Sequence, residues 1–249
     1  MQATARELRL SETVFLLPGD GASCDAIMRI FTPETELPFA GHPTLGAAFV
    51  VGARKELTTV RLMTGAGLVP VTLEREHNEI VYGEMEQPLP TVAPFAQAEP
   101  LLAALGVSEA ALPVEVYVNG PQHVMVALES PEQVAELKPD LGALAGFDGA
   151  VTVSCFAKTG ESEVKTRVFC PAAGVPEDPA TGSAAGPLAL HLVRHGRAGF
   201  GQTLTISQGS EIHRPSQLYA RVEGVAEQVE QVIVGGGAVF VAHGHFRLA

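Results

Sequence analysis

Short apolar runs separated by glycine, proline and polar turns dominate the first half of the chain. Such runs are typical of strands when they span four to eight residues, while a longer apolar stretch indicates a helix. The start, MQATARELRL, reads as an amphipathic helix over residues 1–10, and a second helix is predicted over 41–51. Strands are predicted over residues 12–17, 26–31, 58–63, 68–74 and 79–85.

The second half follows the same pattern. Residues 86–100 hold four prolines, so we expect them to be a linker between domains covering residues 1–92 and 93–249. Helices are expected near 101–105 and over 184–195, and residues 131–144 mix helix and loop. Strands are predicted over residues 114–118, 123–128, 150–157, 164–169, 203–207, 218–222, 231–234 and 238–241. The predicted class is α+β.

The chain also contains a weak internal repeat. Residues 29–33, RIFTP, resemble residues 167–171, RVFCP. After a short loop, each copy continues with glycine, a polar residue and an apolar helix, starting at Gly41-His42 in the first half and at Gly182-Ser183 in the second. Two such units predict two similar domains that face each other across a cleft.

The two predicted helix starts are candidate anion sites. The first amides of a helix have no partner within it and carry partial positive charge, so a carboxylate binds there readily. We therefore expect a small carboxylate substrate, with His42, Asp178 and Ser183 around it and with Gly41 and Gly182 bringing backbone close to it. Each motif taken alone also fits a plain turn or a helix cap.

Glu12 is the candidate acid/base group. It lies in the mostly apolar run LSETVF, where a carboxylate without a partner costs free energy. Burial raises the pKa of a carboxyl group toward neutrality, as acid/base catalysis requires. An exposed position at a strand edge or in a turn is the alternative that spacing leaves open.

Composition narrows the function classes. The formal net charge is −12, which disfavours nucleic acid as a partner. We also expect no membrane span, because apolar runs stay well below the ~20 residues required. The three cysteines, Cys24, Cys155 and Cys170, lack CxxC spacing, which predicts neither a disulfide framework nor a metal site. With no signal-peptide pattern at the start, a cytoplasmic location is expected.

Taken together, the motifs resemble one known family. The segments 10–13 (LSET), 36–43 (ELPFAGHP) and 177–184 (EDPATGSA) match the PhzF phenazine-biosynthesis family in order and spacing. Residues 119–124 (NGPQHV) and the later Gln-Gly and Arg-Pro pairs, at 208–209 and 214–215, extend the match over nearly the whole chain. The resemblance is highly specific.

The resemblance implies a diaminopimelate-epimerase-like fold, in which each of two domains wraps a curved, mostly antiparallel sheet around a central helix. It also implies a cofactor-free homodimer that isomerises trans-2,3-dihydro-3-hydroxyanthranilate. On the matching positions, Glu12 is the catalytic acid/base, and His42, Asp178 and Ser183 are the other polar site residues.

Three departures accompany the resemblance. Gln122 stands where close relatives tend to have arginine, and His213 stands where they have glycine. Met1 falls inside the family's first helix, so either the true start lies upstream or the chain is shortened. For a shortened chain, the first strand of the N-terminal domain is expected to be missing and a sheet edge to be exposed.

Two other readings remain open. The first is an amino-acid racemase or epimerase on the same fold. Such relatives carry one cysteine at each helix start, where this chain has His42 and Ser183. The second is a ligand-binding relative without catalysis, since fold alone does not fix function.

Overall fold

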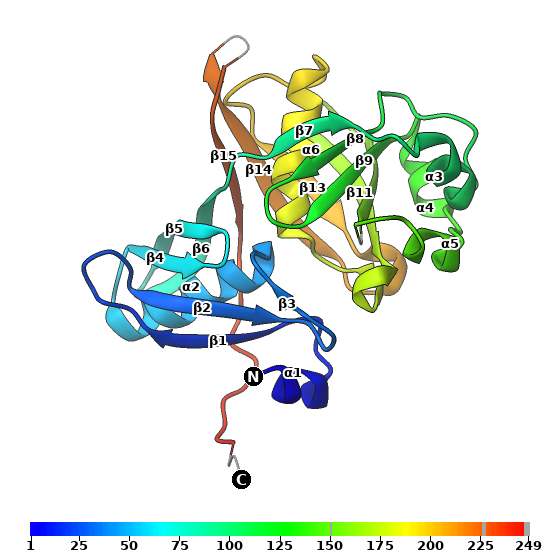
Figure 1. Cartoon of the computed structure of the whole chain (residues 1–249). Coiled ribbons are helices and arrows are strands. Elements are labelled where there is room, and N and C mark those ends of the chain that lie inside the picture. Colours follow the sequence, from blue (N-terminus) through cyan, green and yellow to red (C-terminus); the bar gives the residue numbers. More distant parts are fainter. Residues whose placement is uncertain (150, 226–227, 247–249) are drawn as a thin grey trace.

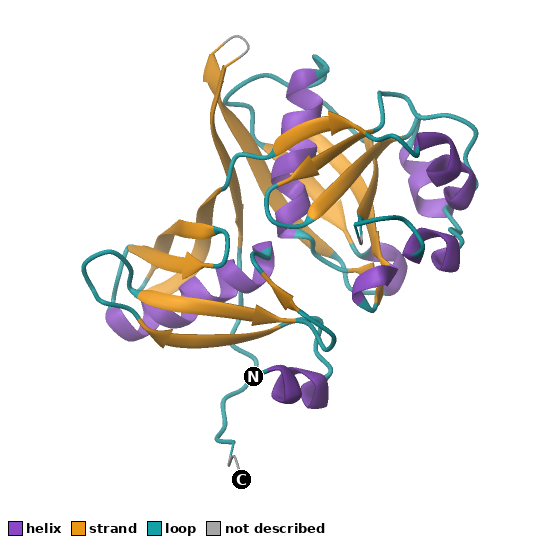
Figure 2. Cartoon of the chain, in the orientation of Figure 1, coloured by secondary structure: helices purple, strands orange, loops and turns teal. Residues whose placement is uncertain are grey.

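The computed structural model describes residues 1–149, 151–225 and 228–246. Fifteen strands form one continuous sheet that bends around two central helices, as Figures 1 and 2 show. The main path of the sheet is β1-β2-β4-β5-β6-β15-β14-β13-β11-β10-β9-β8-β7, while β3 pairs with β2 and β12 pairs with β11. The predicted α+β class and the helix-in-sheet architecture are therefore confirmed.

The N-terminal lobe, blue to cyan in Figure 1, surrounds helix α2. Its elements are α1 (Gln2–Leu8), β1 (Thr13–Pro18), β2 (Ala26–Phe31), β3 (Glu36–Leu37), α2 (Gly41–Lys55), β4 (Thr59–Thr64), β5 (Gly67–Glu76) and β6 (Glu79–Gln87).

The second lobe surrounds helix α6, with three short helices packed at one side (Figure 2). Its elements are β7 (Thr91–Pro94), α3 (Ala98–Leu105), β8 (Glu115–Val118), β9 (Gln122–Ala127), α4 (Pro131–Glu136), α5 (Leu141–Ala145), β10 (Thr152–Lys158), β11 (Glu163–Cys170), η1 (Pro171–Ala173), β12 (Val175–Asp178), α6 (Gly182–Arg194), β13 (Leu204–Gln208), η2 (Ser210–Ile212), β14 (Ser216–Val225) and β15 (Gln228–Gly236).

The sequence repeat is a repeat of topology. In the first lobe β2 pairs antiparallel with β1 and β3 and parallel with β4. In the second lobe β11 pairs antiparallel with β10 and β12 and parallel with β13. Each unit then passes through its central helix into two further antiparallel pairings.

An ion pair marks the same place in both units. Arg29 on β2 donates to Glu36 on β3 at 2.8 and 2.7 Å. Arg167 on β11 donates to Glu177 on β12 at 3.0 and 2.8 Å. The first pair is half-exposed, whereas the second is nearly buried, so the two copies differ in how much solvent screens them.

Local residue choice explains the tight turns. β5 and β6 are joined by His77 and Asn78, both with positive φ, as a two-residue turn of the type I′ class requires. Gly120, with φ of 123°, turns the chain between β8 and β9. Both hairpins confirm the predictions made from the sequence.

The strand β15 connects the lobes. It pairs antiparallel with β14 of the second lobe and with β6 of the first, and in Figure 1 it runs between them. One hydrophobic core accordingly contains buried residues of both central helices, among them Phe49 of α2 and Leu188 of α6. A second core lies under α3, α4 and α5.

Several expected elements need correction. Residues 238–241 form no strand, and Val239, Phe240 and Val241 of this apolar run are exposed. The expected linker 86–100 contains β7, which pairs with β8, and the start of α3. The two-residue β3 and the short β12 were not predicted. Residue 150, the first of a predicted strand, lies outside the described residues, and the domain boundary at residue 92 stays a prediction.

In the part of the chain that the structure describes, the helices are too short or too polar to cross a membrane.

Candidate active site

The N-termini of α2 and α6 meet backbone to backbone. A side chain on Gly41 would overlap the peptide between Gly182 and Ser183. A Cβ on Gly182 would lie 3.0 Å from the backbone nitrogen of His42. Both glycines are therefore needed for the two helix starts to approach. Because each start carries unpaired amides and partial positive charge, their meeting point attracts an anion.

Glu12, the residue just before β1, lies against this junction. Its Oε2 atom is 2.8 Å from His42 Nε2, and 14% of the glutamate side chain is exposed. Oε2 is otherwise buried, without a hydrogen bond of good geometry among the described residues. The carboxyl oxygen is thus desolvated and close to the imidazole of His42, a proton carrier.

The charges of the site favour a protonated His42. Burial opposes the charge on the imidazole, but contact with the Glu12 carboxylate, the charge of Asp178 and a backbone hydrogen bond at Ala180 outweigh it. The pKa of His42 is therefore raised above its ordinary value. A cationic His42 beside Glu12 can both hold a substrate anion and relay a proton.

Asp178 is buried and is the last residue of β12, just before the loop that leads into α6. Burial raises its pKa, and the charge of His42 together with a hydrogen bond from Thr181 opposes only part of that rise. Thr181 Oγ1 donates to one carboxyl oxygen at 2.5 Å, while the other, Oδ1, is buried without a partner among the residues that the structure describes. Gln208 holds this loop by donating to the Asp178 carbonyl at 2.6 Å and accepting from the Thr181 amide at 3.1 Å.

The first turn of α6, which carries Ser183, is fixed from outside the helix. Pro187 lacks an N–H, so the carbonyl of Ser183, four residues before it, has no helical donor. Asn119 Nδ2 donates to that carbonyl at 2.9 Å. Gln87 Nε2 donates to the carbonyl of Gly182 at 2.7 Å. Two side chains from the ends of β6 and β8 thereby position the helix start.

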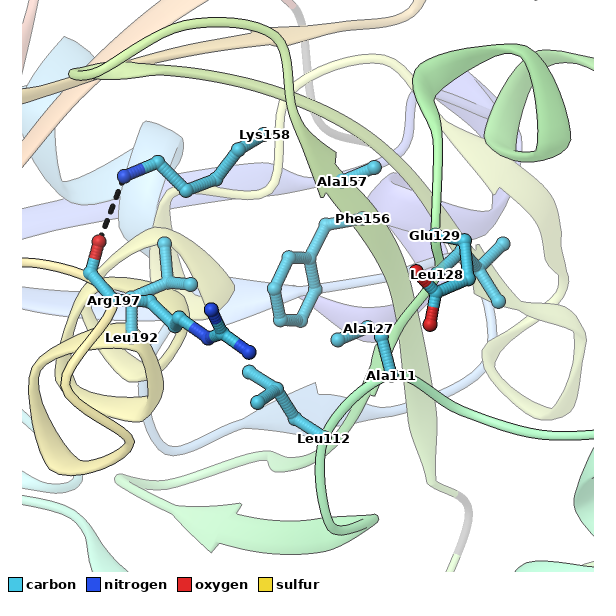
Figure 3. Close-up of a pocket in the computed structure, with 10 residues that line it drawn as sticks. All are labelled: Ala111, Leu112, Ala127, Leu128, Glu129, Phe156, Ala157, Lys158, Leu192 and Arg197. Carbon is cyan, nitrogen blue, oxygen red and sulfur yellow. Dashed lines mark hydrogen bonds between the residues drawn. The ribbon is translucent and has the colours of Figure 1, made fainter.

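A pocket of about 250 Å³ opens at the junction. Its lining includes His42, Ala180 and Gly182. It also includes residues 216–218 at the start of β14 and residues 234–237 at the end of β15 and just after it. Figure 3 shows a different pocket of about 210 Å³, around Phe156 and Leu192, which contains none of the predicted site residues. Its Lys158 donates to the Arg197 carbonyl at 2.7 Å.

The predicted site residues therefore come together. Glu12, His42 and Asp178 interact through charge, and Ser183 lies where the helix starts touch. Gln87 was missed as a supporting residue. Thr181, Gln208 and Asn119 entered the sequence reasoning only through the family motifs, because nothing in a local pattern reports a contact made across dozens of residues.

Cys170 also lies near the site. Burial raises the pKa of its thiol, and the charges of Asp178 and Glu12 add to this effect. The thiol form is therefore favoured at neutral pH, whereas proton abstraction by cysteine requires the thiolate. This environment does not suit a cysteine base.

Comparison with known proteins identifies the family of this chain. A family model described as phenazine biosynthesis-like protein, PhzC-PhzF, matches residues 1–244. The chain is 49% identical over 250 residues to a trans-2,3-dihydro-3-hydroxyanthranilate isomerase of Pseudomonas aeruginosa, covering all of this chain and 88% of that protein. A similarly named protein of Pseudomonas fluorescens is 47% identical and is covered to 87% by 98% of this chain.

Solved structures agree. A Bacillus anthracis protein of the PhzF family superposes with a TM-score of 0.81 at 26% identity, over 97% of this chain and 86% of that one. A hydroxyproline epimerase of Agrobacterium vitis, with a TM-score of 0.63 at 16% identity over 91% and 71%, shares the fold. The expectations of an isomerase and of a diaminopimelate-epimerase-like fold are confirmed. The chain belongs to the PhzC-PhzF family of phenazine biosynthesis-like proteins.

Proposed function

We propose that this isomerase converts trans-2,3-dihydro-3-hydroxyanthranilate by a proton shift in which Glu12 is the acid/base. The observation that carries the proposal is the Glu12 carboxyl oxygen, desolvated and 2.8 Å from His42 Nε2, at the junction of two helix starts. The name of the Pseudomonas aeruginosa relative, 49% identical over the full length of this chain, supports the choice of substrate.

The step is redox-neutral. Glu12 as carboxylate takes a proton from a ring carbon that conjugation makes acidic, so that one C–H bond breaks and its electron pair enters the conjugated system. Glu12 then returns the proton to another ring carbon on the same face, where a new C–H bond forms. The resulting enol tautomerises to an aminoketone. One carboxyl group acting on one face accounts for the shift without an organic cofactor or a metal.

The remaining site residues hold the substrate and its charge. The substrate carboxylate binds at the helix junction, where the amides after Gly41 and Gly182 and the hydroxyl of Ser183 can donate hydrogen bonds. Protonated His42 stabilises the carboxylate of Glu12 and charge that develops on the ring. Asp178, whose pKa burial raises, is placed to exchange protons with His42.

Replacement of Glu12 tests the proposal. Glu12→Gln should lower kcat on the order of 10²–10⁴-fold with an unchanged melting temperature, because the amide cannot accept the proton. Glu7→Gln, at an exposed position on α1, is the matched control and should leave kcat unchanged. Loss of the ultraviolet absorbance of the dihydro compound measures turnover. Normal turnover by Glu12→Gln would refute the mechanism.

The alternative function, an amino-acid racemase or epimerase, is tested with the same protein preparation. The protein should not exchange the α-proton of free amino acids in deuterated water, because His42 and Ser183 stand where a cysteine pair would be needed. Exchange that survives Glu12→Gln would overturn the assignment. We further propose that the chain acts as a homodimer, which light scattering during gel filtration tests directly.

A further inference from the structure

The far end of α6 carries a cluster of chemistry-bearing side chains that the proposed isomerisation does not use. His191 on α6 and His195, the C-cap residue just after the helix, stand one helical turn apart, and Glu115 of β8 contacts both. His191 follows Ser183 by eight residues, so it lies about 12 Å further along the helix axis. The cluster is therefore separate from the active-site junction.

The distances within the cluster match a metal site. Glu115 Oε2 is 3.2 Å from His191 Nδ1 and 3.0 Å from His195 Nε2. A nitrogen or oxygen atom of each of the three residues lies within 4.8 Å of the others. In a tetrahedral zinc site with bonds of about 2.0–2.1 Å, neighbouring ligand atoms lie about 3.3 Å apart. The two distances from Glu115 Oε2 to the imidazole nitrogens are thus close to the spacing that a tetrahedral ion requires.

The surroundings hold these atoms in place. Tyr117 and Phe156 pack edge-on against the ring of His191, at centroid distances of 5.6 and 5.7 Å. The hydroxyl of Tyr117 lies 3.0 Å from His191 Nδ1 and donates to Glu115 Oε2 at 2.9 Å. Its oxygen occupies a further corner of the cluster. A ligand whose ring is already locked by packing loses little entropy when an ion binds.

The polar groups of the cluster are not all satisfied by one another. The side chain of His191 is fully buried, and its Nε2 has no hydrogen-bond partner among the described residues. When Nδ1 binds a cation, Nε2 keeps the ring hydrogen. Arg194 approaches the opposite carboxyl oxygen, Oε1, at 3.5 Å, so Oε2 faces the two imidazoles and the hydroxyl of Tyr117. Two nitrogens and one carboxylate oxygen therefore converge from three side chains.

We propose that Glu115, His191 and His195 bind a divalent transition-metal ion of the zinc class. Two imidazoles with one carboxylate favour zinc, cobalt or nickel over magnesium and calcium, which prefer all-oxygen sites. The side chain of His195 is 20% exposed, so an ion would enter the cluster from the side of this residue. The ion would tie β8 to the C-terminal half of α6.

The experiment is a titration of chelator-treated protein with zinc chloride by calorimetry, and with cobalt chloride by visible absorption. His243 and His245, an exposed pair near the C-terminus, are first replaced by Gln, so that tail histidines cannot bind the probe. This background should bind one ion per chain, show the absorption of tetrahedral cobalt and melt at a higher temperature with zinc.

His195→Gln in that background is the decisive variant, because its partly exposed site tolerates the change. It should weaken zinc binding at least about 10-fold, the lower end of what loss of even an outer-shell partner costs, and should abolish the thermal shift. His42→Gln should bind like the background, since it alters only the active-site pair. Absence of zinc binding, equal binding by His195→Gln, or loss of binding in His42→Gln would each overturn the proposal.

Discussion

Gly41 and Gly182 are in backbone contact, so that the two central helices begin at one point although the two glycines are 141 positions apart in the chain. This contact creates the anion-binding junction. The contact depends on the absence of a side chain at both glycines. His42, the residue after Gly41, links this junction to the carboxyl group of Glu12.

Replacement of Gly41 should therefore disrupt the site. Gly41→Ala places a methyl group into the peptide after Gly182, so we expect a lower melting temperature and a loss of turnover. Gly46→Ala on the same helix is the matched control, because a Cβ there meets nothing within 4 Å. It should stabilise the protein by up to about 1 kcal/mol through helix propensity. Equal behaviour of the two variants in thermal unfolding would contradict the packing argument.

The pairing of Asn119 with Ser183 predicts a coupling between two distant positions. Asn119→Ala leaves the Ser183 carbonyl buried without a donor and should cost about 1–3 kcal/mol of unfolding free energy. Pro187→Ala restores the N–H of the helix at that carbonyl. In the Pro187→Ala background, Asn119→Ala should therefore cost less. Denaturant unfolding of all four proteins gives the coupling energy, and strict additivity would show that the carbonyl is not shared.

The two repeated ion pairs should differ in strength. Arg167 is nearly buried and also donates to the Leu137 carbonyl at 2.8 Å, so Arg167→Gln leaves buried Glu177 unpaired and should cost about 3–5 kcal/mol. Arg29→Gln at the equivalent, half-exposed position should cost at most about 1 kcal/mol. Urea denaturation compares them, and equal losses would mean that burial does not set the difference.

His213 occupies a backbone conformation suited to glycine. Its φ is 57° and its side chain is exposed, and the family resemblance places glycine at this position. His213→Gly should relieve the left-handed strain and stabilise the folded chain by up to about 1 kcal/mol, net of the entropy that glycine gains on unfolding. Thermal unfolding measures it. A clear loss of stability would show that the imidazole makes a contact that outweighs the strain.

Buried His123 predicts a loss of stability in acid. Within the described part of the chain, both of its ring nitrogens lack hydrogen-bond partners, and burial lowers its pKa from 6.5 to about 3. Unfolding therefore takes up a proton below pH 6.5, and the free energy of unfolding should fall as pH drops toward 3, by up to about 1.4 kcal/mol per pH unit from this group. His123→Leu should flatten that part of the urea-unfolding profile between pH 6.5 and 4. An unchanged slope would remove His123 as a cause.

The sequence determined the local and the repeated features of this protein. Hydrophobic alternation and turn residues identified most strands and both central helices, because these patterns report burial and backbone conformation within one element. The two copies of the Arg-x-Phe-x-Pro segment predicted two like units, and the family motifs pointed to Glu12, His42, Asp178 and Ser183.

The tertiary structure alone decided the contacts between residues that lie far apart in the sequence. It set Glu12 against His42, gave the Ser183 carbonyl to Asn119, and paired β15 with both β14 and β6. It also left the apolar run of residues 238–241 outside the sheet. A local pattern states that a residue can enter a strand or a site. Whether it does depends on a partner that only the folded chain brings within hydrogen-bonding distance.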